Sequence, residues 1–356
     1  MKFAQAVSLL AGLVPTRASN PALGHIHLDT KDGVLVGRAS NGEVDLEIMT
    51  TEAALELDPG GVLVPPAGFA RFVASLKEPA LGYDPETREL VVSGGAASAR
   101  FRTGRADDFP EMRAFGGEVP RVRIPAGELR RALSVRFASS AEDYRAIFRG
   151  VQFEFREKGF RTAASDGFRL AVYDFPESEG EVERLFVIAR KSLDVLSKLL
   201  PGDESPVEVA VQGPQVQFVW EGVRLVLTAM EGQFPDYERV VPKEITHTIE
   251  APRDDLLTAL KRLAPLTDPN TARVDVRFED GAATLTAEGD YGKANDRVEL
   301  LAVQGEPVLQ SYNLHYLQEA LQHVDTDRAT LELSGPVTPA VIRGESTWSI
   351  VVPLRT

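Results

Sequence analysis

The sequence predicts an α+β protein of three repeated domains, each with two helices packed on antiparallel sheets. The first observation behind this prediction is a duplicated loop, because Phe109-Pro110 recurs 125 positions later as Phe234-Pro235. The second is that helix and strand patterns recur around both loops in nearly the same frame, which indicates an internal repeat. The chain has 356 residues and is 43% hydrophobic, enough for each repeat to bury its own core.

Turn segments and the strand patterns before them recur along the chain. The segment Ala39–Gly42 recurs as Ala164–Gly167, and a weaker third copy is Ala287–Gly289. Alternation of apolar and polar residues, typical of half-buried antiparallel strands, precedes each copy. These alternating segments lie at residues 25–29, 151–155 and 274–278.

Six helices are expected, two in each repeat. The first helix of each repeat is predicted at residues 4–14, 125–137 and 252–263, and the second at residues 66–78, 188–200 and 312–324. Pro125 and Pro252 suit the first turn of a helix, where the missing N–H costs nothing. Strand–turn–strand sequence follows each second helix. We therefore place the domains at residues 1–118, 119–243 and 244–356.

The composition excludes several classes of protein. The chain has no cysteine, so it has neither disulfides nor a thiolate metal site. Its first 18 residues superficially resemble a signal peptide, but Gln5 and Ser8 interrupt the apolar run, whose residues recur at helical spacing. No other segment reaches the length of a membrane span. We expect a cytoplasmic protein.

Charge is divided unevenly along the chain. The net charge is −14, yet the six helical segments, with the first extended to Arg17, together carry +6 and leave −20 elsewhere. One interpretation is that helices simply carry solvated basic residues. The other is a basic helical face and an acidic sheet face. Basic helices without a base-reading motif would contact phosphates without reading sequence.

Catalytic and metal-binding signals are missing from the sequence. It has no phosphate-binding loop, no dinucleotide fingerprint and no HExxH motif. Asp107-Asp108 and Asp254-Asp255 are better explained by a strand or loop and by a helix's first turn than by acid–base chemistry. Ser165 has no nearby histidine base in the sequence. We expect neither a catalytic residue nor a cofactor.

Four further segments carry a family resemblance: ASDGFRLAVYDF at 164–175, EGQFPDYERVVP at 231–242, YNLHYLQEAL at 312–321 and VVPLRT at 351–356. With the repeat, they resemble the bacterial DNA polymerase III beta subunits, the sliding clamps, in order over the whole chain. The resemblance implies a homodimeric ring of six similar domains around duplex DNA, with helices lining the hole. It also implies a non-catalytic protein that tethers the polymerase III alpha subunit, the clamp loader, other polymerases and repair proteins through short linear peptides.

The resemblance also implies three sets of site residues. Residues expected to face the DNA are Arg17, Arg71, Arg131, Arg136, Arg145, Lys191, Lys198 and Lys261. Residues expected to line a hydrophobic groove for partner peptides are Phe148, Ser165, Gly167, Phe168, Arg169, Leu170, Pro235, Arg239, Val240, Ile350, Val352, Pro353, Leu354 and Arg355. Residues expected at the dimer joint are Phe101 and Thr103 on one side and Pro265 and Leu266 on the other.

The groove that the resemblance implies is also consistent with the chemistry of peptide anchors. Aliphatic side chains and proline would form dry pockets for Leu and Phe, and Arg169 and Arg239 would hold carbonyls or an acid at the rim. Leu170 and Val240 could instead be core residues. Phe168 departs from family members that carry His or Tyr at this place.

The sequence is also compatible with other interpretations. Met1 aligns with about Ala126 of the second repeat, so we expect the first domain to be short of one edge strand or to cap its first helix differently. A secreted or periplasmic β-repeat binding protein is an alternative, which cleavage near residue 18 would support. An enzyme with a carboxylate cleft is another, although no residues converge for it.

Overall fold

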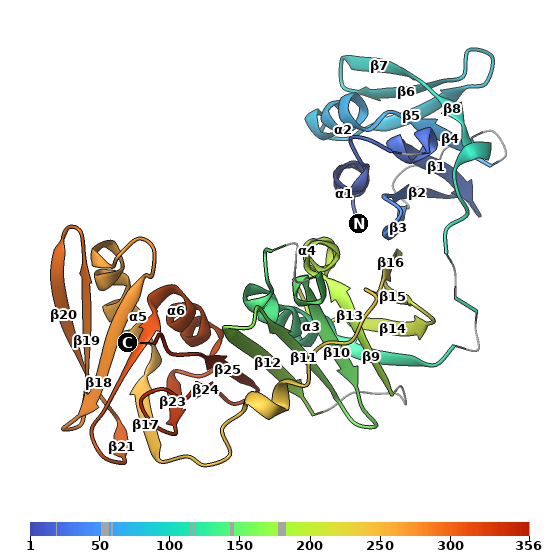
Figure 1. Ribbon diagram of the computed structural model, residues 1–356. Coiled ribbons are helices and arrows are strands. Elements are labelled where there is room, and N and C mark those ends of the chain that lie inside the picture. Colours follow the sequence, from blue (N-terminus) through green and yellow to red (C-terminus); the bar gives the residue numbers. More distant parts are fainter. Residues whose placement is uncertain are drawn as a thin grey trace. The chain divides into compact units, whose positions relative to one another are not determined.

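The computed structural model describes residues 1–18, 20–50, 57, 60–113, 115–116, 119–142, 146–176 and 183–355. It is α+β, as expected, with antiparallel sheets and few helices (Figure 1). The described residues form two compact units. Unit 1 is residues 1–127 with 191–229, and unit 2 is residues 128–176 with 183–190 and 230–355. The middle third of the chain contributes to both, because strand pairing continues across the expected boundaries at 118 and 243.

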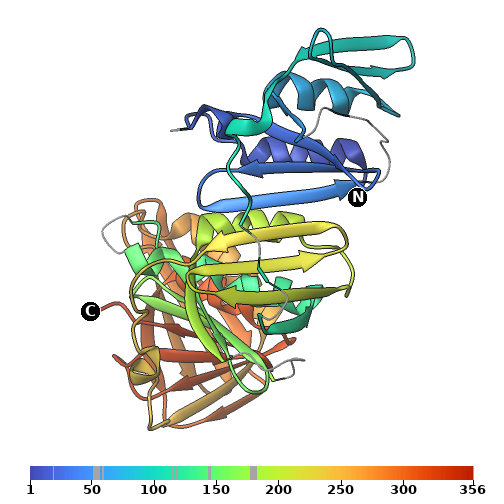
Figure 2. The same cartoon turned by 90° about the vertical axis from the view of Figure 1, so that its right-hand side faces the viewer.

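Unit 1 contains a nine-stranded sheet, in the order β8-β4-β1-β2-β3-β16-β15-β14-β9, and a three-stranded sheet, β5-β6-β7. In Figure 2 the larger sheet runs without a break from the blue strands to the yellow ones. Its strands are β1 Ile26–Lys31, β2 Val34–Ser40, β3 Val44–Thr50, β4 Val62–Val64, β8 Gly104–Arg105, β9 Arg121–Pro125, β14 Pro206–Gln212, β15 Gln215–Trp220 and β16 Val223–Thr228. The smaller sheet has β5 Ala80–Asp84, β6 Glu89–Gly94 and β7 Ala97–Arg102.

Unit 1 has both α-helices and short 3-10 helices among its described residues. They are α1 Phe3–Leu13, α2 Pro66–Ser75 and α4 Arg190–Leu199, with the short 3-10 helices η1 Pro21–Gly24 and η2 Ala106–Asp108. Helix α1 packs on α2 and on strands β2 and β3. Phe69 of α2 contacts Phe3 of α1 and Phe101 of β7, with ring centroids 6.4 and 5.5 Å away. Packing through α1 and α2 thus connects the large sheet to the small one.

Unit 2 repeats this plan with a second nine-stranded sheet, β13-β10-β11-β12-β25-β24-β23-β17-β21, and a four-stranded sheet, β20-β19-β18-β22. The large sheet has β10 Gly150–Phe155, β11 Phe160–Ser165, β12 Arg169–Phe175, β13 Arg184–Ala189, β17 His247–Pro252, β21 Ala302–Gln304, β23 Arg328–Leu333, β24 Ala340–Arg343 and β25 Thr347–Val351. The small sheet has β18 Arg273–Glu279, β19 Ala282–Gly289, β20 Gly292–Glu299 and β22 Val308–Asn313.

Helices α5 (Arg253–Leu263) and α6 (Leu314–His323) lie side by side in unit 2 (Figure 1). Their apolar faces share one core with strands of both sheets. Asn313 caps α6 by accepting from the N–H groups of His315 and Tyr316, as an N-cap asparagine should. The shorter helices of unit 2 are η3 Leu133–Ala138, η4 Ala146–Arg149, η5 Tyr237–Val240 and η6 Ala264–Leu266.

Helix α3 (Ala126–Ala132) is shorter than predicted, because the expected helix 125–137 becomes the 3-10 helix η3 after Ala132. The Thr162 hydroxyl donates to the carbonyl of Ala132 at 2.8 Å, the acceptor that would continue the α-helix. Pro125 and Pro252 were predicted to be the first residues of their helices, but each lies one residue before its helix begins. Pro125 ends strand β9, and Pro252 is the N-cap of α5.

The first repeat lacks one strand among the described residues. Strand β9 precedes α3 and pairs with β14, and β17 precedes α5 and pairs with β23. Helix α1 begins at Phe3 after the extended Lys2, and β5 pairs with β6 alone in the described chain. Among the described residues, the start of α1 thus differs from the starts of α3 and α5, which a strand precedes.

His323 is a buried polar link at the end of α6. Its Nε2 lies 3.1 Å from the carbonyl oxygen of Val172, which can only accept, so Nε2 carries the proton. Nδ1 then accepts from the Ser134 hydroxyl at 3.1 Å. Burial lowers the pKa of His323 below its usual 6.5 and outweighs the opposing effect of the Val172 hydrogen bond. The neutral ring joins α6 to β12 and η3.

We expect His323 to make the stability of the protein fall in mild acid. As the pH drops through 6.5, the unfolded chain takes up the proton before the folded one, so the contribution of the neutral ring is full above that pH and is lost below it. Between about pH 7.5 and about pH 5.5, His323→Gln should lose about 1 kcal/mol less unfolding free energy than the wild type. Urea denaturation at both pH values measures this, with the exposed His315→Gln as control. Equal losses in wild type and His323→Gln would contradict it.

Candidate functional site

Strand pairing brings the predicted groove residues together in unit 2. Strand β12 pairs with β25, so that Leu170 lies opposite Ile350. The pairing continues beyond β25, where the N–H of Val352 donates to the carbonyl of Phe168 at 3.0 Å. The turn before β12 and the C-terminal segment, residues 352–355, therefore lie next to each other.

The loop at 231–242 joins the same place through aromatic packing. Phe234 and Tyr237 are each 8% exposed and belong to one core cluster with Leu170 and Ile350. Phe148 packs on this cluster, with its ring 5.9 Å from that of Phe234. Pro235, Arg239 and Val240 lie exposed along the loop and η5. The predicted set comes from four separate segments and meets around one cluster.

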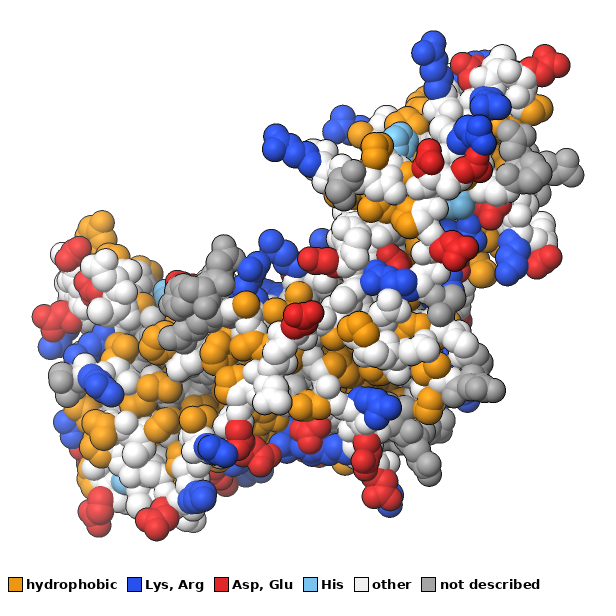
Figure 3. All heavy atoms as spheres, turned by 45° about the vertical axis from the view of Figure 1, so that its right-hand side comes forward, with side chains coloured by type: hydrophobic (Ala, Val, Ile, Leu, Met, Phe, Trp, Pro, Cys, Tyr) orange, Lys and Arg blue, Asp and Glu red, His pale blue; other side chains and the backbone are white. Residues whose placement is uncertain are grey.

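Three apolar side chains of the set are at the surface, and we call them the apolar patch: Phe168, Val240 and Val352. They are 54%, 54% and 38% exposed. Hydrophobic side chains reach the surface over a broad area of the face in Figure 3, with charged side chains along its margins. Val240 is thus not a core residue. Leu170 and Ile350 are core residues, at 3% and 2% exposed, in the same cluster as Phe234 and Tyr237.

The remaining predicted residues shape the site through the backbone. The Ser165 hydroxyl donates to the carbonyl of Arg169 and accepts from the N–H of Gly167, so it holds the turn. Gly167 has φ +90°, which favours glycine. Pro353 is buried, and the N–H of Leu354 donates to the carbonyl of Ser311 at 2.7 Å. Arg355 is exposed.

Val337 is a further exposed apolar residue of unit 2, one that the sequence analysis did not single out. It is 71% exposed, in the turn between β23 and β24. The Gln310 amide holds this turn by donating to the carbonyls of Gly335 and Thr338. Ser311, the next residue of β22, accepts from Leu354. The sequence signal for Val337 is an aliphatic residue between Pro336 and Pro339, where a turn normally carries polar side chains.

Arg169 is engaged within unit 2 and does not stand at a rim. Its side chain is 11% exposed and bonds Asp166 Oδ2 at 3.0 Å, the carbonyl of Phe137 at 2.8 Å and the carboxylate of Glu319. The guanidinium also lies 4.4 Å from the ring centroid of Tyr316. It joins β12 to η3 and α6. Arg239 is different, because it pairs with Asp236 while remaining 84% exposed.

Most of the predicted DNA-facing residues are exposed helical cations. Arg71 on α2, Lys191 and Lys198 on α4, Lys261 on α5, and Arg17 after α1 are all exposed. Arg131 is exposed but pairs with Glu128, which also accepts from the buried Tyr173 hydroxyl. Arg136 is half-buried, and Arg145 lies outside the described residues.

The predicted joint residues lie in or beside the small sheets of the two units. Phe101 of β7 packs edge-on against Phe69, and the N–H and hydroxyl of Thr103 both donate to the carbonyl of Arg88. Pro265 and Leu266 form η6, which packs against β19 and β20 of the small sheet of unit 2. Pro265 is exposed and Leu266 is half-buried.

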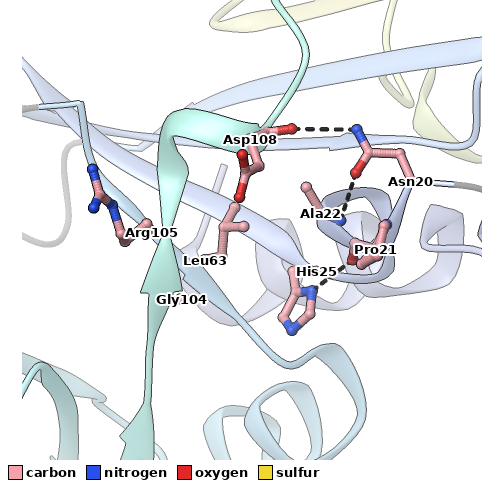
Figure 4. Close-up of a pocket in the computed structure, with 8 residues that line it drawn as sticks. All are labelled: Asn20, Pro21, Ala22, His25, Leu63, Gly104, Arg105 and Asp108. Carbon is pink, nitrogen blue, oxygen red and sulfur yellow. Dashed lines mark hydrogen bonds between the residues drawn. The ribbon is translucent and has the colours of Figure 1, made fainter.

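The duplicated loop has a structural role in unit 1. The Phe109 ring lies 5.0 Å from that of His27, centroid to centroid. Beside it is a pocket of about 430 Å³, drawn in Figure 4, where the Asn20 amide donates to the carbonyl of Asp108 at 3.3 Å. His25 Nδ1 lies 3.1 Å from the carbonyl of Pro21 in the same pocket. The sequence did not predict this pocket.

Two family models match successive parts of the chain. The central domain of the DNA polymerase III beta subunit matches residues 123–236, and its C-terminal domain matches residues 238–352. The chain belongs to the DNA polymerase III beta subunit family. Its function is therefore that of a DNA sliding clamp in replication, a non-catalytic role, and the binding-protein alternative is not supported.

Relatives of the beta subunit family match along nearly the whole chain. The beta sliding clamp of Vibrio cholerae is 25% identical over 351 residues, 97% of this chain and 95% of that protein. That of Caulobacter vibrioides is 27% identical over 349 residues, 95% of this chain and 92% of the relative. A Pseudomonas aeruginosa sliding clamp bound to griselimycin superposes with a TM-score of 0.91 at 23% identity, covering 99% of this chain and 97% of that one.

Two further observations concern metal sites and membrane spans in this beta subunit. In the described ranges, no group of three or more His, Asp or Glu side chains is placed to hold a metal ion. None of the helices there is both long and apolar enough to cross a membrane.

We expect Arg169 to contribute to stability and Arg239 not to. Arg169→Gln removes the largely buried guanidinium that Asp166 and Glu319 share and should lower the free energy of unfolding by about 2 to 3 kcal/mol. Arg239→Gln removes an exposed pair and should change it by less than about 0.5 kcal/mol. Urea denaturation followed by circular dichroism measures both. Similar small effects would place Arg169 among the surface residues.

Proposed function

We propose that two copies of this chain close head to tail into a ring that encircles duplex DNA and tethers the replicative polymerase. In this proposal each copy supplies three domains, residues 1–118, 119–243 and 244–356. The partners beyond DNA are the polymerase III alpha subunit, the clamp loader, other polymerases and repair proteins. Each partner binds through a short linear peptide.

The observation that supports the ring is a strand pairing that occurs twice within the chain and has a third, unpaired counterpart. In each nine-stranded sheet, the third strand after a first helix pairs with the third strand after a second helix: β3 with β16, and β12 with β25. The corresponding strands of the two small sheets are β20 and β7. Each is a sheet edge among the described strands. An open edge offers unpaired N–H and C=O groups to another strand.

Pairing β20 of one copy with β7 of another satisfies both edges. The same contact then recurs on the opposite side, and two identical contacts related by a twofold axis close a ring. Phe101 of β7 and the η6 residues Pro265 and Leu266 lie beside these edges, which supports their assignment to the joint. Thr103 follows β7 directly.

The exposed helical cations supply the DNA contacts in this proposal. Arg17, Arg71, Lys191, Lys198 and Lys261 are exposed and can meet phosphates, and contacts to phosphates carry no sequence information. Arg131, Arg136 and Arg145 complete the proposed set. Closure around DNA replaces high affinity, so the acidic remainder of the chain does not oppose retention.

The apolar patch is the proposed peptide site. Phe168, Val240 and Val352 supply apolar surface over the buried Leu170 and Ile350, while Phe148 and Pro235 extend it along the loop. Exposed apolar side chains on a rigid base suit the Leu and Phe anchors of a short peptide. We add Val337 to this surface. Arg239 remains available at its edge, and Arg169 holds the base in place.

We expect the protein to stay on circular DNA and to leave linear DNA. After loading onto a nicked circle by the clamp loader of the same organism, gel filtration should recover protein with the DNA until a restriction enzyme cuts the circle. Topological linkage predicts this loss, because the ring slides off a free end. Equal retention on cut and uncut DNA would mean ordinary binding and overturn the ring.

We expect Val240→Asp to weaken peptide binding at least tenfold without changing stability, because Val240 is exposed and loses only an intermolecular contact. The probe is a fluorescein-labelled octapeptide ending in Asp-Leu-Phe, measured by anisotropy. Griselimycin, the ligand of the P. aeruginosa clamp, is a second probe. Leu185→Asp, on the similarly exposed β13, is the matched control. Unchanged binding by Val240→Asp, or equal loss in both variants, would contradict the site.

A further inference from the structure

Helix η5 carries part of the proposed peptide surface but has little structure of its own. It spans Tyr237–Val240, and Asp236 at its N-cap makes no side-chain capping bond. Val240 and Arg239 point outward from it, while Tyr237 is buried. A single 3-10 turn is not stable alone, so its position depends on what holds Tyr237 and Glu238.

Arg161 of β11 is the charged group that reaches η5 from below. Its Nε and Nη2 bond the two carboxylate oxygens of Asp174 at 2.5 and 3.1 Å, and its Nη1 bonds Glu238 Oε1 at 3.0 Å. The Arg161 side chain is 16% exposed, whereas that of Glu238 is 69% exposed. Burial opposes the charge of Arg161, but the bonds to Asp174 outweigh it and raise the pKa, so the guanidinium stays charged.

Asp174 is fixed in turn by the neighbouring strand β25. Trp348 Nε1 donates to Asp174 Oδ2 at 3.2 Å, and the N–H of Asp174 donates to the carbonyl of Ser346 at 2.9 Å. The Trp348 ring lies 6.3 Å from that of Tyr237, centroid to centroid. Burial raises the pKa of Tyr237 and outweighs the nearby charge of Arg161, which would lower it. The hydroxyl therefore stays neutral.

These contacts connect η5 to three strands of the sheet. Arg161 comes from β11, Asp174 from β12 and Trp348 from β25. A bidentate guanidinium–carboxylate pair fixes direction as well as distance. An ion pair and an aromatic contact then pass that direction to Glu238 and Tyr237. The sheet thus determines where η5 presents Val240 and Arg239.

We propose that the Arg161–Asp174 pair, together with Trp348, positions η5 and so sets the affinity of the peptide site. Arg161 is a positioning residue, because it acts through Glu238 and Tyr237 and not by touching the peptide. The inference rests on the proposed peptide site and adds residues outside it.

Arg156 provides a matched comparison on the same surface. It is another arginine close to Asp174, with Nη1 3.8 Å from Oδ1. Its main partner is Glu154, which it bonds through Nε and Nη2 at 2.9 and 3.0 Å. Replacing Arg156 removes an arginine near Asp174 and leaves the contacts from Arg161 to η5 in place.

The test measures the octapeptide ending in Asp-Leu-Phe on full-length wild type, Arg161→Gln, Arg156→Gln and Val240→Asp. We expect Arg161→Gln to raise the Kd about tenfold, within the range of effects known for residues that act on a site without touching its ligand. Arg156→Gln should stay within about twofold of wild type. In a Trp220→Phe background, where Trp348 is the remaining tryptophan, Arg161→Gln should also shift the Trp348 emission, and hydrogen exchange should rise at residues 234–241.

The outcomes separate this inference from the peptide site itself. If wild type does not bind the peptide, the proposed function fails. If Val240→Asp loses binding while Arg161→Gln binds like wild type, the site stands and the positioning inference is overturned. Equal losses in Arg161→Gln and Arg156→Gln also overturn it, since the effect would then be general.

A second variant covers the case in which Arg161→Gln does not fold. Glu238→Gln changes an exposed side chain and removes the ion pair that links Arg161 to η5. We expect a Kd about threefold above wild type, because the aromatic contact remains. An unchanged Kd for Glu238→Gln would overturn the inference.

Discussion

The whole arrangement depends on antiparallel pairing between strands that close two successive repeats. Strand β3 pairs with β16, and β12 pairs with β25. In both cases the partner lies more than a hundred residues further along the chain. Each pairing turns two modest sheets into one of nine strands, which leaves few open edges and fixes neighbouring repeats in register. The same pairing places Leu170 opposite Ile350, so the site belongs to the joint and not to any single repeat.

Much of this fold could be predicted because its signals are local and repeated. Alternation at period two marks the strands, and the recurrence of Ala39–Gly42 as Ala164–Gly167 aligns two repeats without any structure. The four segments that carry the family resemblance also meet in space, as expected for residues 164–175 and 231–242. Helix ends were less predictable. The Thr162 hydroxyl that ends α3 lies 30 positions from its acceptor.

The roles of charged residues could not be predicted in the same way. Arg169 and Arg239 look alike in sequence, each a cation next to an apolar residue. Their difference comes from Glu319, which is 150 positions from Arg169 and reaches it only because α6 packs against β12. The partnership of Arg161 with Asp174 and Glu238 likewise exists only after three segments are assembled. Burial of a charge is decided by tertiary contacts, whereas apolar periodicity is visible in the chain itself.

The C-terminal segment is held largely by its own backbone. Val352 bonds Phe168 through main-chain atoms, and Leu354 bonds Ser311 in the same manner. Such bonds do not depend on which side chain is present. One wall of the site therefore has a frame that mutation leaves intact while its lining changes. Over evolutionary time, substitutions at these positions can follow the changing sequences of the proteins that bind there, with no need to rebuild the fold.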